Sequence, residues 1–410
     1  MLPSRAAPGR DEYRRAQLAI AALFCFLGFQ YGTWASRLPA LKTRLDLGAA
    51  ELGLLLMATG VGAAASFPLV ALLMRRLGSR LLSLGAALVL AAILLALAVV
   101  PNYPVALLLM ACDGVAVGAL NVAMNAQGAA LEVKYGRTTM AKLHATFSGG
   151  SLCAALLASA VNLATPALAV HFSVAAALLL LLVGYARPAL LPPEPAPAST
   201  GLADPASSPA RRRLTLPARL TIWMGLAMAF GTITEGAMND WSALYLRDVA
   251  GAATELAPMG IAVVSVMMVL ARIFADGWRD RWGDGRIVRL GSALAAAGLA
   301  LALLAGGVLP ALLGFACVGL GVAAVTPCVY VAAARRDSDS LALVAAMGTV
   351  GLLAGPAVIG FIANGSGLTW GMGAVAASAG IVSLCATRIH WPAQTPTTAA
   401  PTPTPTPEAA

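Results

Sequence analysis

Long apolar segments recur along the whole chain and constrain its fold more than any other feature. Residues 81–100 form one of them, with hardly a charge inside. A helix of about 18 or more apolar residues is long enough to cross the ~30 Å hydrocarbon core of a lipid bilayer. Only 11% of the residues are charged, against roughly 25% in a typical soluble domain. The sequence therefore predicts a protein that crosses a membrane many times.

Gly, Pro and charged turn signals separate these segments from one another. The predicted spans begin near Ala16, Glu51, Leu81, Val105, Met140, Ala167, Arg219, Leu256, Val288, Pro310, Leu341 and Leu368. The pattern is six segments, a break, and six more. We expect an all-α membrane protein of about twelve transmembrane helices, in two pseudo-symmetric six-helix bundles.

The domain organisation follows from composition. Residues 1–15 are a tail, 16–187 the first bundle and 218–390 the second bundle. Between the bundles, residues 188–217 contain a Pro-Pro-Glu-Pro-Ala-Pro string and an arginine cluster, a composition that cannot bury a core and predicts a linker. The Thr-Pro repeats of residues 391–410 predict a disordered tail.

The basic residues indicate how the chain is oriented. The formal net charge is +9, which on a membrane protein reports topology rather than a nucleic-acid partner, because Lys and Arg concentrate on the cytoplasmic side. With the N-terminus inside, all but four basic residues fall on that side: Arg37, Lys42, Arg44 and Arg247. The first apolar segment, residues 16–38, exceeds the ~7–15 residues of a signal-peptide core. We expect an uncleaved first span and both termini in the cytoplasm of a bacterial inner membrane.

Neither a metal site nor a cofactor is predicted. The six cysteines all lie within apolar runs and lack the paired spacing of metal ligands, so we interpret them as small hydrophobic residues. No Gly-rich phosphate loop ending in Lys-Ser or Lys-Thr occurs, and no nucleophile or cofactor motif suggests an enzyme. An ion gradient, most simply of protons, is the expected driving force.

The two halves of the chain resemble each other. Asp46-Leu-Gly-Ala-Ala-Glu51 corresponds to Asp248-Val-Ala-Gly-Ala-Ala-Thr-Glu255. Two shorter strings also correspond: Arg-Leu-Gly ending at residue 78 with Arg-Trp-Gly ending at 283, and Ala-Cys-Asp-Gly at 111–114 with Ala-Cys-Val-Gly at 316–319. A constant offset near half the chain length indicates a duplicated six-helix unit, which is the layout of transporters whose halves rock around a site near the bilayer midplane.

Ionisable and amide side chains inside the spans are the candidate site residues, since a charge at mid-bilayer costs at least ~2.5–3.5 kcal/mol. In the fourth span Asp113, Asn121 and Asn125 lie within about 120° of one helix face, and Glu132 returns to that face. The two asparagines either join helices or line a solute path. Asp113 is the stronger functional candidate, because a lone carboxylate is hard to explain as a helix contact.

The seventh span supplies a second acidic candidate. Glu235 and Asn239 share one face, while Asp240 points about 140° away and either faces water or serves the site. A desolvated carboxylate such as Glu235 can load a proton near neutral pH. We therefore predict Glu235 in proton coupling or solute contact.

Three further candidates lie in the first and fifth spans. Gln30 and Trp34 share a face, and either grip a polar, sugar-like solute or anchor the span at the membrane interface. His144 opens the fifth span and is either a pH-sensitive group facing Glu132 or a structural residue.

A charge network is predicted at the cytoplasmic end of the eighth span. Its members are Arg272, Asp276, Asp280 and Arg281. Charge pairs at a helix end that faces another bundle can hold one conformation closed and break in the other. We expect these four residues to act in gating.

Several of these strings resemble the YbjJ-like inner-membrane group of the major facilitator superfamily, which is related to the fucose permease branch. They are Asn125-Ala-Gln-Gly-Ala-Ala-Leu-Glu132, the His-x-x-Phe-Ser of residues 144–148, Glu235-Gly-x-x-Asn239-Asp240-Trp241 and Thr349-x-Gly-x-x-x-Gly355-Pro356. The similarity covers residues 15–390. It implies alternating access around a cavity lined by helices 1, 4, 7 and 10, and Tyr330 of the tenth span joins the solute-contact candidates on this ground.

The chain departs from that family at two positions. Asn121 stands where the fucose permease branch has a proton-coupling acid, so Asp113 and Glu235 are the candidates to replace it. Arg75 stands where the gating motif has an acid, whereas the second half retains Asp280.

The function predicted from the sequence is secondary active transport of a small solute, with symport of protons. The partners are a solute, protons and the lipid bilayer, with no nucleic acid, and we expect a monomer. Two alternatives stay open: a proton antiporter that exports drugs or metabolites, and a membrane receptor or scaffold that binds a ligand without moving it.

Overall fold

The computed structural model describes residues 10–137, 139–192, 219–336 and 338–391, and every regular element in that part of the chain is a helix. Of the predicted linker and tails, residues 193–217, 1–9 and 392–410 lie outside these ranges, whereas residues 10–15 of the predicted N-terminal tail belong to the first helix. The first half comprises α1 (Arg10–Ser36), α2 (Leu38–Leu45), α3 (Ala49–Ala65), α4 (Phe67–Ala98), α5 (Tyr103–Tyr135), α6 (Met140–Ala164), α7 (Leu168–Ala186) and the 3-10 turn η1 (Arg187–Ala189). The second half comprises α8 (Arg219–Asp248), α9 (Met259–Trp282), α10 (Asp284–Ala305), α11 (Val308–Val322), α12 (Val325–Ala334), α13 (Ser338–Ser366) and α14 (Leu368–Arg388).

The helices have the length and composition of membrane spans. Within the described residues, nine helical segments are long and apolar enough to cross a bilayer, and two shorter apolar segments cover Ala49–Ala65 and Met259–Ala275. Helices satisfy their own backbone hydrogen bonds, which is why they are suited to hydrocarbon. The predicted all-α membrane fold is confirmed.

Two predicted spans are interrupted within the membrane-spanning region. The second span begins as α3 and continues into α4 after Ser66, where Pro68 lacks the N–H that would continue the hydrogen-bond ladder. Gly78 then turns the chain within α4 with φ 71°, so the third span is the rest of that helix. The tenth span is divided in the same way into α11 and α12.

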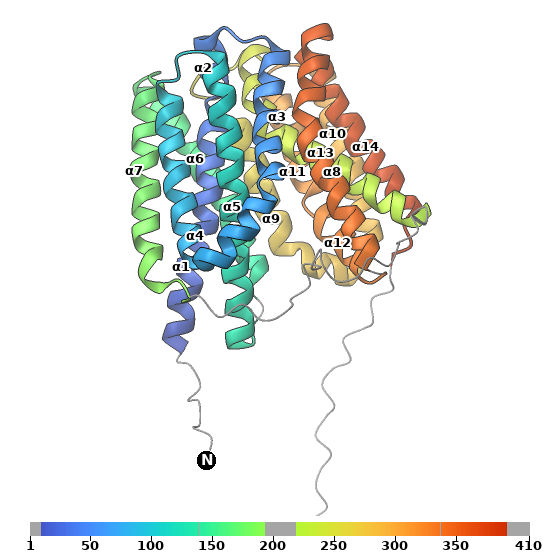
Figure 1. The fold of residues 1–410 in the computed structure, drawn as a ribbon. Coiled ribbons are helices and arrows are strands. Elements are labelled where there is room, and N and C mark those ends of the chain that lie inside the picture. The colour runs from blue at the N-terminus through green and yellow to red at the C-terminus, as the bar shows by residue number, and fades with distance from the viewer. Residues whose placement is uncertain (1–9, 138, 193–218, 337, 392–410) are drawn as a thin grey trace, which may run out of the picture.

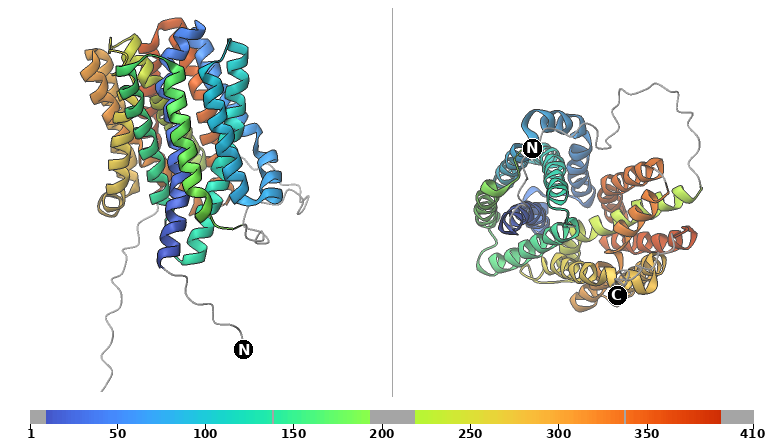
Figure 2. Two further views of the ribbon diagram at one scale, coloured as in Figure 1. Left: turned by 90° about the vertical axis from the view of Figure 1, so that its left-hand side faces the viewer. Right: turned by 90° about the horizontal axis from the view of Figure 1, so that it is seen from below.

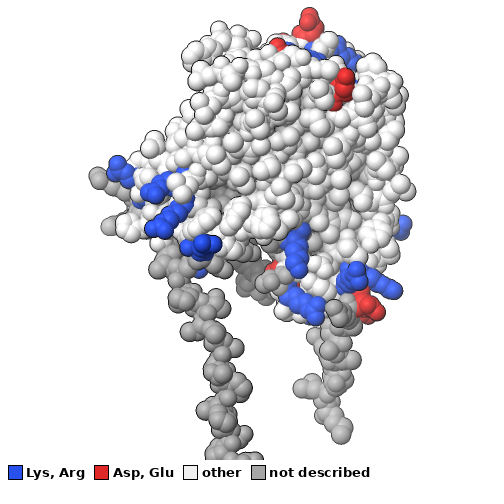
Figure 3. Space-filling model, turned by 180° about the vertical axis from the view of Figure 1, so that it is seen from behind, with Lys and Arg blue, Asp and Glu red and all other residues white. Residues whose placement is uncertain are grey.

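The long axes of the helices define two ends of the molecule (Figure 1). We call the end where α1 begins the lower end and the end that carries α2 the upper end. Seen from below, the helices of the first half gather on one side and those of the second half on the other (Figure 2). Charged side chains collect near the two ends and leave a broad uncharged band between them (Figure 3), as expected for a surface in contact with lipid.

The internal duplication predicted from the sequence is visible in the backbone. Gly78 and Gly283 both have positive φ, 71° and 78°, at the turns that follow the second and eighth spans. Asp46 and Gly251 form a second such pair, with φ 52° and 73°. Since 205 residues separate the members of each pair, the same unit has been folded twice.

The duplicated unit depends on close helix contacts at glycine. A Cβ on Gly114 of α5 would lie 1.8 Å from the backbone oxygen of Thr59 in α3. The equivalent Gly319 of α11 approaches the backbone oxygen of Val264 in α9, where a Cβ would lie at 2.6 Å. Hydrocarbon offers no hydrophobic drive for helix association, so such close packing holds the helices together.

We predict that Gly114→Ala destabilises the fold by about 1–3 kcal/mol, because the added methyl group forces α5 away from α3. Gly85→Ala is the matched control, since its Cβ would meet nothing within 4 Å. Thermal unfolding in detergent should show a lower midpoint for Gly114→Ala and no loss for Gly85→Ala. Equal midpoints would contradict the packing argument.

Candidate functional site

The polar site lies on helices from both halves and is centred on α1. The side chain of Gln30 donates through Nε2 to Oδ1 of Asp113 on α5, at 2.8 Å. Both side chains are 0% exposed. The remaining oxygens, Gln30 Oε1 and Asp113 Oδ2, have no protein partner, so this pair keeps two buried acceptors for a ligand, a water or a proton.

The next residue of α1 joins the two halves. Tyr31 donates its hydroxyl to Oδ1 of Asp240 on α8, at 2.5 Å, and Asp240 is 4% exposed. The Tyr31 ring meets the ring of Trp34 edge to face, with centroids 4.9 Å apart. Adjacent residues of α1 thus contact one carboxylate from each half.

A charged group lies next to Gln30, Tyr31, Trp34, Asp113 and Asp240, which we call the Tyr31 layer. Arg272 of α9 donates through Nη2 to Oε1 of Glu235 on α8, at 3.3 Å, and through Nη1 to Oγ of Ser148 on α6, at 2.7 Å. The Arg272 and Glu235 side chains are 28% and 31% exposed. Ion pairs with this exposure contribute little stability, so the group is better explained by function than by folding.

Exposure of the polar groups changes along the molecule. Gln30, Asp113 and Asp240 are buried, whereas Glu235 and Arg272 are half-buried. Asn121 of α5 and His144, near the lower end of α6, are exposed. Polar side chains are not tolerated against lipid at this depth, which indicates a water-filled recess that reaches the lower end.

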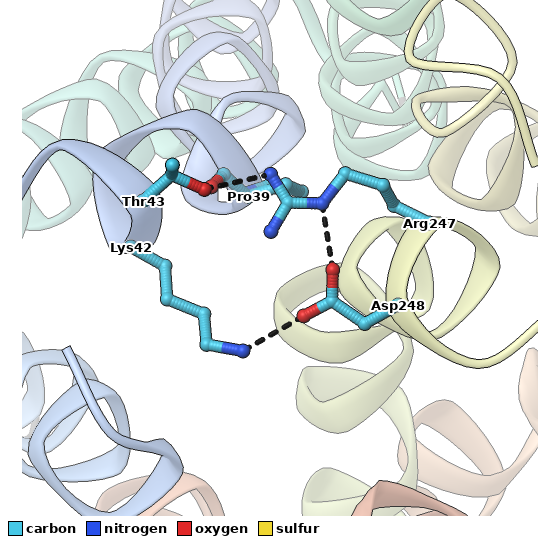
Figure 4. Close-up of polar contacts among 5 residues, drawn as sticks. All are labelled: Pro39, Lys42, Thr43, Arg247 and Asp248. Carbon is cyan, nitrogen blue, oxygen red and sulfur yellow. Dashed lines mark hydrogen bonds and ion pairs between the residues drawn. The ribbon is translucent and has the colours of Figure 1, made fainter. Parts of the chain in front are cut away.

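The upper end is closed by an ion network between α2 and α8 (Figure 4). Lys42 contacts Oδ2 of Asp248 at 2.7 Å, and Arg247 contacts Oδ1 of Asp248 at 2.7 Å and Oγ of Thr43 at 3.2 Å. Burial alone would raise the pKa of Asp248, but hydrogen bonds from Arg247 and Lys42 hold it below the ordinary value. The network therefore binds the ionised carboxylate of Asp248.

Two further contacts close the same end between α6 and the α8–α9 connection. Ser159 donates to the backbone oxygen of Glu255 at 2.5 Å, and Asn162 donates to the backbone oxygen of Thr254 at 3.1 Å. On the other side α3 and α13 approach at glycine, where a Cβ on Gly53 would lie 2.8 Å from a backbone oxygen of α13. The halves are therefore in contact around the upper end.

The predicted solute-contact residues divide into four groups. Gln30 and Trp34 are buried in the Tyr31 layer, and Trp34 Nε1 lacks a partner. Asn125 donates to both the backbone and the side-chain oxygen of Asn121, each at 2.8 Å. Asn239, on α8, donates to the backbone oxygen of Glu235 at 3.1 Å. Tyr330, on α12, is half-buried with no side-chain hydrogen bond among those described.

The predicted proton-coupling residues do not form one cluster. Asp113 and Glu235 contact different partners, as described above. Glu132 accepts from the backbone N–H groups of Thr139 and Met140, the latter at 2.8 Å, and so caps the start of α6. His144 packs edge to face on the ring of Phe24, at 5.0 Å.

The predicted gating set is spread over more than two helical turns. Arg272 lies near the end of the apolar part of α9, which runs from Met259 to Ala275, while the helix itself continues to Trp282. Arg281 is exposed near the end of α9. The side chains of Asp276 and Asp280 lie outside the described part of the structure. A neighbour of this set, Arg279, binds Asp284 across the Gly283 turn at 2.8 Å.

Sequence reasoning missed the role of Tyr31 and left Asp240 unresolved. The angle of about 140° between Asp240 and Glu235 indicated a side chain turned away from the site, yet α1 packs on that face of α8. The Asn-Asp-Trp string at 239–241 was the available signal. Only the position of α1 shows that side chains on both faces of α8 contact other helices inside the molecule.

Comparison with known proteins places this geometry among transporters. The family model described as Major Facilitator Superfamily matches residues 18–340. An uncharacterised MFS-type transporter of Yersinia pestis is 32% identical and aligns over 90% of this chain and 93% of its own. An uncharacterised transporter of Sinorhizobium fredii is 31% identical over 84% of this chain and 90% of its own.

Solved structures agree on the fold. A mutant of the nucleoside transporter NupG superimposes with a TM-score of 0.71, at 15% identity, over 92% of this chain and 99% of its own. A D-xylose-proton symporter superimposes with a TM-score of 0.71, at 14% identity, over 91% of this chain and 97% of its own. At such identities the likeness concerns the fold alone.

We predict that Asp248→Asn lowers stability by about 1 kcal/mol or less at neutral pH, because the network at the upper end loses its charge. The pKa of Asp248 is lowered in the folded protein, so its contribution is present above the ordinary value of about 4 and is lost as the pH falls through the lowered one. The difference in unfolding midpoint between wild type and Asp248→Asn should therefore vanish in acid. Asp46→Asn, an exposed change on the same side, should give no difference at any pH.

Proposed function

The chain belongs to the major facilitator superfamily, and on that premise we propose that it is a secondary transporter that moves a small polar solute by alternating access. The family, the transporter relatives and the fold support a non-enzymatic transport role. The duplicated halves supply two bodies that can rock against each other. The solute class follows from the amide and aromatic side chains of the Tyr31 layer and its surroundings.

One observation carries the proposal: the Arg272–Glu235 ion pair is half-exposed, while Gln30, Asp113 and Asp240 next to it are buried. A solute entering from the lower end reaches this charged group and cannot pass the Tyr31–Asp240 contact or the ion network above it. Release at the upper end then requires those contacts to part and others to form below. This conformation is therefore one of the two that alternating access needs.

We propose protons as the coupling ion and Glu235 as the principal coupling residue. Arg272 forms an ion pair with Glu235 at a half-exposed site, and protonation of Glu235 would release Arg272 to bind the solute or Ser148 alone. Asp113 is a second candidate because its free oxygen is buried. His144 faces the same recess. We keep Glu132 among the proposed coupling residues only because its carboxylate binds the start of α6.

The solute contacts proposed are the amides and aromatic residues already placed by the structure: Gln30, Trp34, Asn121, Asn125, Asn239 and Tyr330. Arg272 and Arg281, with Asp276 and Asp280, are the proposed gating residues. Among these, Arg272 reaches across to Ser148 on α6 of the other half.

We also propose the cellular setting. The lower end carries most of the visible basic side chains (Figure 3), which the positive-inside bias assigns to the cytoplasm. On this orientation both termini and the 188–217 linker are cytoplasmic and the membrane is a bacterial inner membrane. A monomer of the YbjJ-like group, with bundles at 16–187 and 218–390, completes the proposal.

We predict solute-triggered proton movement in proteoliposomes that contain a trapped pH dye. A panel of sugars, polyols, nucleosides, organic acids and drugs is added outside, and a working solute should change the internal pH in the wild type. Glu235→Gln should abolish this change, because the amide cannot carry a proton. Glu12→Gln, an exposed carboxylate at the start of α1, is the matched control and should behave as the wild type.

The outcomes separate the alternatives. Uptake of labelled solute without proton movement would keep the transporter and remove proton coupling. Protons that leave the vesicle as a drug or metabolite enters would indicate exchange and favour the proton antiporter. Binding of a solute that never crosses the bilayer would replace the transporter by a receptor.

A further inference from the structure

We propose that Asp240 is a proton-binding residue that couples protonation to closure of the upper end, through its hydrogen bond with Tyr31 of the other half. The inference rests on the proposed function and adds to it a carboxylate distinct from Glu235. It concerns the conformational equilibrium, and so it can be tested without knowing the solute.

The geometry of the bond makes Asp240 sensitive to the separation of the halves. Tyr31 belongs to α1 and Asp240 to α8, and the 2.5 Å contact between them lies on the upper side of Glu235. Parting of the halves at the upper end must break this contact and admit water to the carboxylate. The Gln30–Asp113 bond differs, because both residues belong to the first half and can stay together when the halves part.

Charge makes the closed state costly unless Asp240 is neutral. Among the described residues, no cation lies within ion-pair distance of Asp240, and Tyr31 supplies its side-chain hydrogen bond. An unpaired carboxylate out of water costs several kcal/mol. A proton on Oδ2 removes that cost, and Oδ1 still accepts from Tyr31.

The surrounding groups do not supply the missing positive charge. Tyr31 lies within electrostatic reach of Asp113 and Glu235 as well as Asp240. The nearby cation on α9, Arg272, is bound to Glu235. On α2, Lys42 is bound to Asp248 at the upper end.

The remaining helices against α8 add little. In the described part of α11 and α12, the titratable side chains are Tyr330 and two cysteines. Helices α13 and α14 place no described charged side chain beside Asp240. Three carboxylates therefore lie within electrostatic reach of Tyr31, and among the described residues only Glu235 is paired with a guanidinium, that of Arg272. Protons are the simplest way to balance the two in excess.

A direction of coupling follows. Closure of the upper end buries Asp240 and favours the protonated form, while opening exposes it to water, which accepts the proton. Lower pH at the upper side thus favours the conformation seen here. A proton that Asp240 binds from the upper side would then stay bound when the upper end closes and the recess is open at the lower end.

The test measures opening of the upper end directly. Spin labels are placed at Val99 and Leu309, which are exposed positions in the two halves, at the upper ends of α4 and α11. The native cysteines are replaced by alanine, and the protein is studied in nanodiscs without solute. The distance distribution is recorded as the pH is raised.

We expect the wild type to shift from a short to a long distance with rising pH. Asp240→Asn, which keeps the shape and the acceptor oxygen, should stay at the short distance at every pH. Asp46→Asn should follow the wild type. Tyr31→Phe should increase the long-distance population about two- to tenfold at a given pH, since a hydrogen bond to the neutral carboxyl group is worth about 0.5–1.5 kcal/mol.

Three results would overturn the proposal: a wild type that ignores pH, an Asp240→Asn variant that keeps the pH response, or a Tyr31→Phe variant with an unchanged population. If Asp240→Asn does not fold, the Tyr31→Phe comparison decides alone. Failure of the transport proposal looks different, because no solute would cross in vesicles while the distances still responded to pH.

Discussion

The cost of leaving a polar group unpaired in hydrocarbon governs this structure. It requires the backbone to be helical throughout the spans, and it makes close contacts at Gly114 and Gly319 the means of holding helices together. The same cost applies to side chains. Asp113 and Asp240 each have a hydrogen-bond donor from α1, and Glu235 has the guanidinium of Arg272. The candidate site therefore consists of the polar side chains that the fold keeps within the spans, together with the partners that bind them.

Polar side chains avoid that cost in different ways at the two ends of the molecule. At the upper end, side chains of the two halves pair with one another, as Lys42 does with Asp248. Toward the lower end, Asn121 and His144 stay exposed to water in the recess. A transporter that alternates must exchange these roles, so contacts between halves, such as Tyr31–Asp240 and Arg272–Ser148, are the ones whose free energies decide the equilibrium.

The fold was largely predictable because its rules are local and repetitive. Apolar segment length gave the spans, and an offset of 205 residues reappears in the backbone at Gly78 and Gly283. Predictions failed where a break or an extension depends on neighbouring helices. The break before α4 was not predicted from the sequence, nor was the continuation of α9 as a helix to Trp282, beyond its apolar part that ends at Ala275. A charged residue within a span looks like a helix end until its partner, here Glu235, is known.

Hydrophobicity, period and repeat are properties of the chain alone, so the class of protein, the duplicated architecture and the short set of polar residues in the spans follow from the order of residues. The tertiary structure decided which of those residues meet. Glu132 caps α6, Gln30 serves Asp113, and Asp240 faces Tyr31 across the halves. A helical angle places a side chain relative to its own helix, while its partner depends on which helix packs against that face, and only the folded chain brings residues 31 and 240 together.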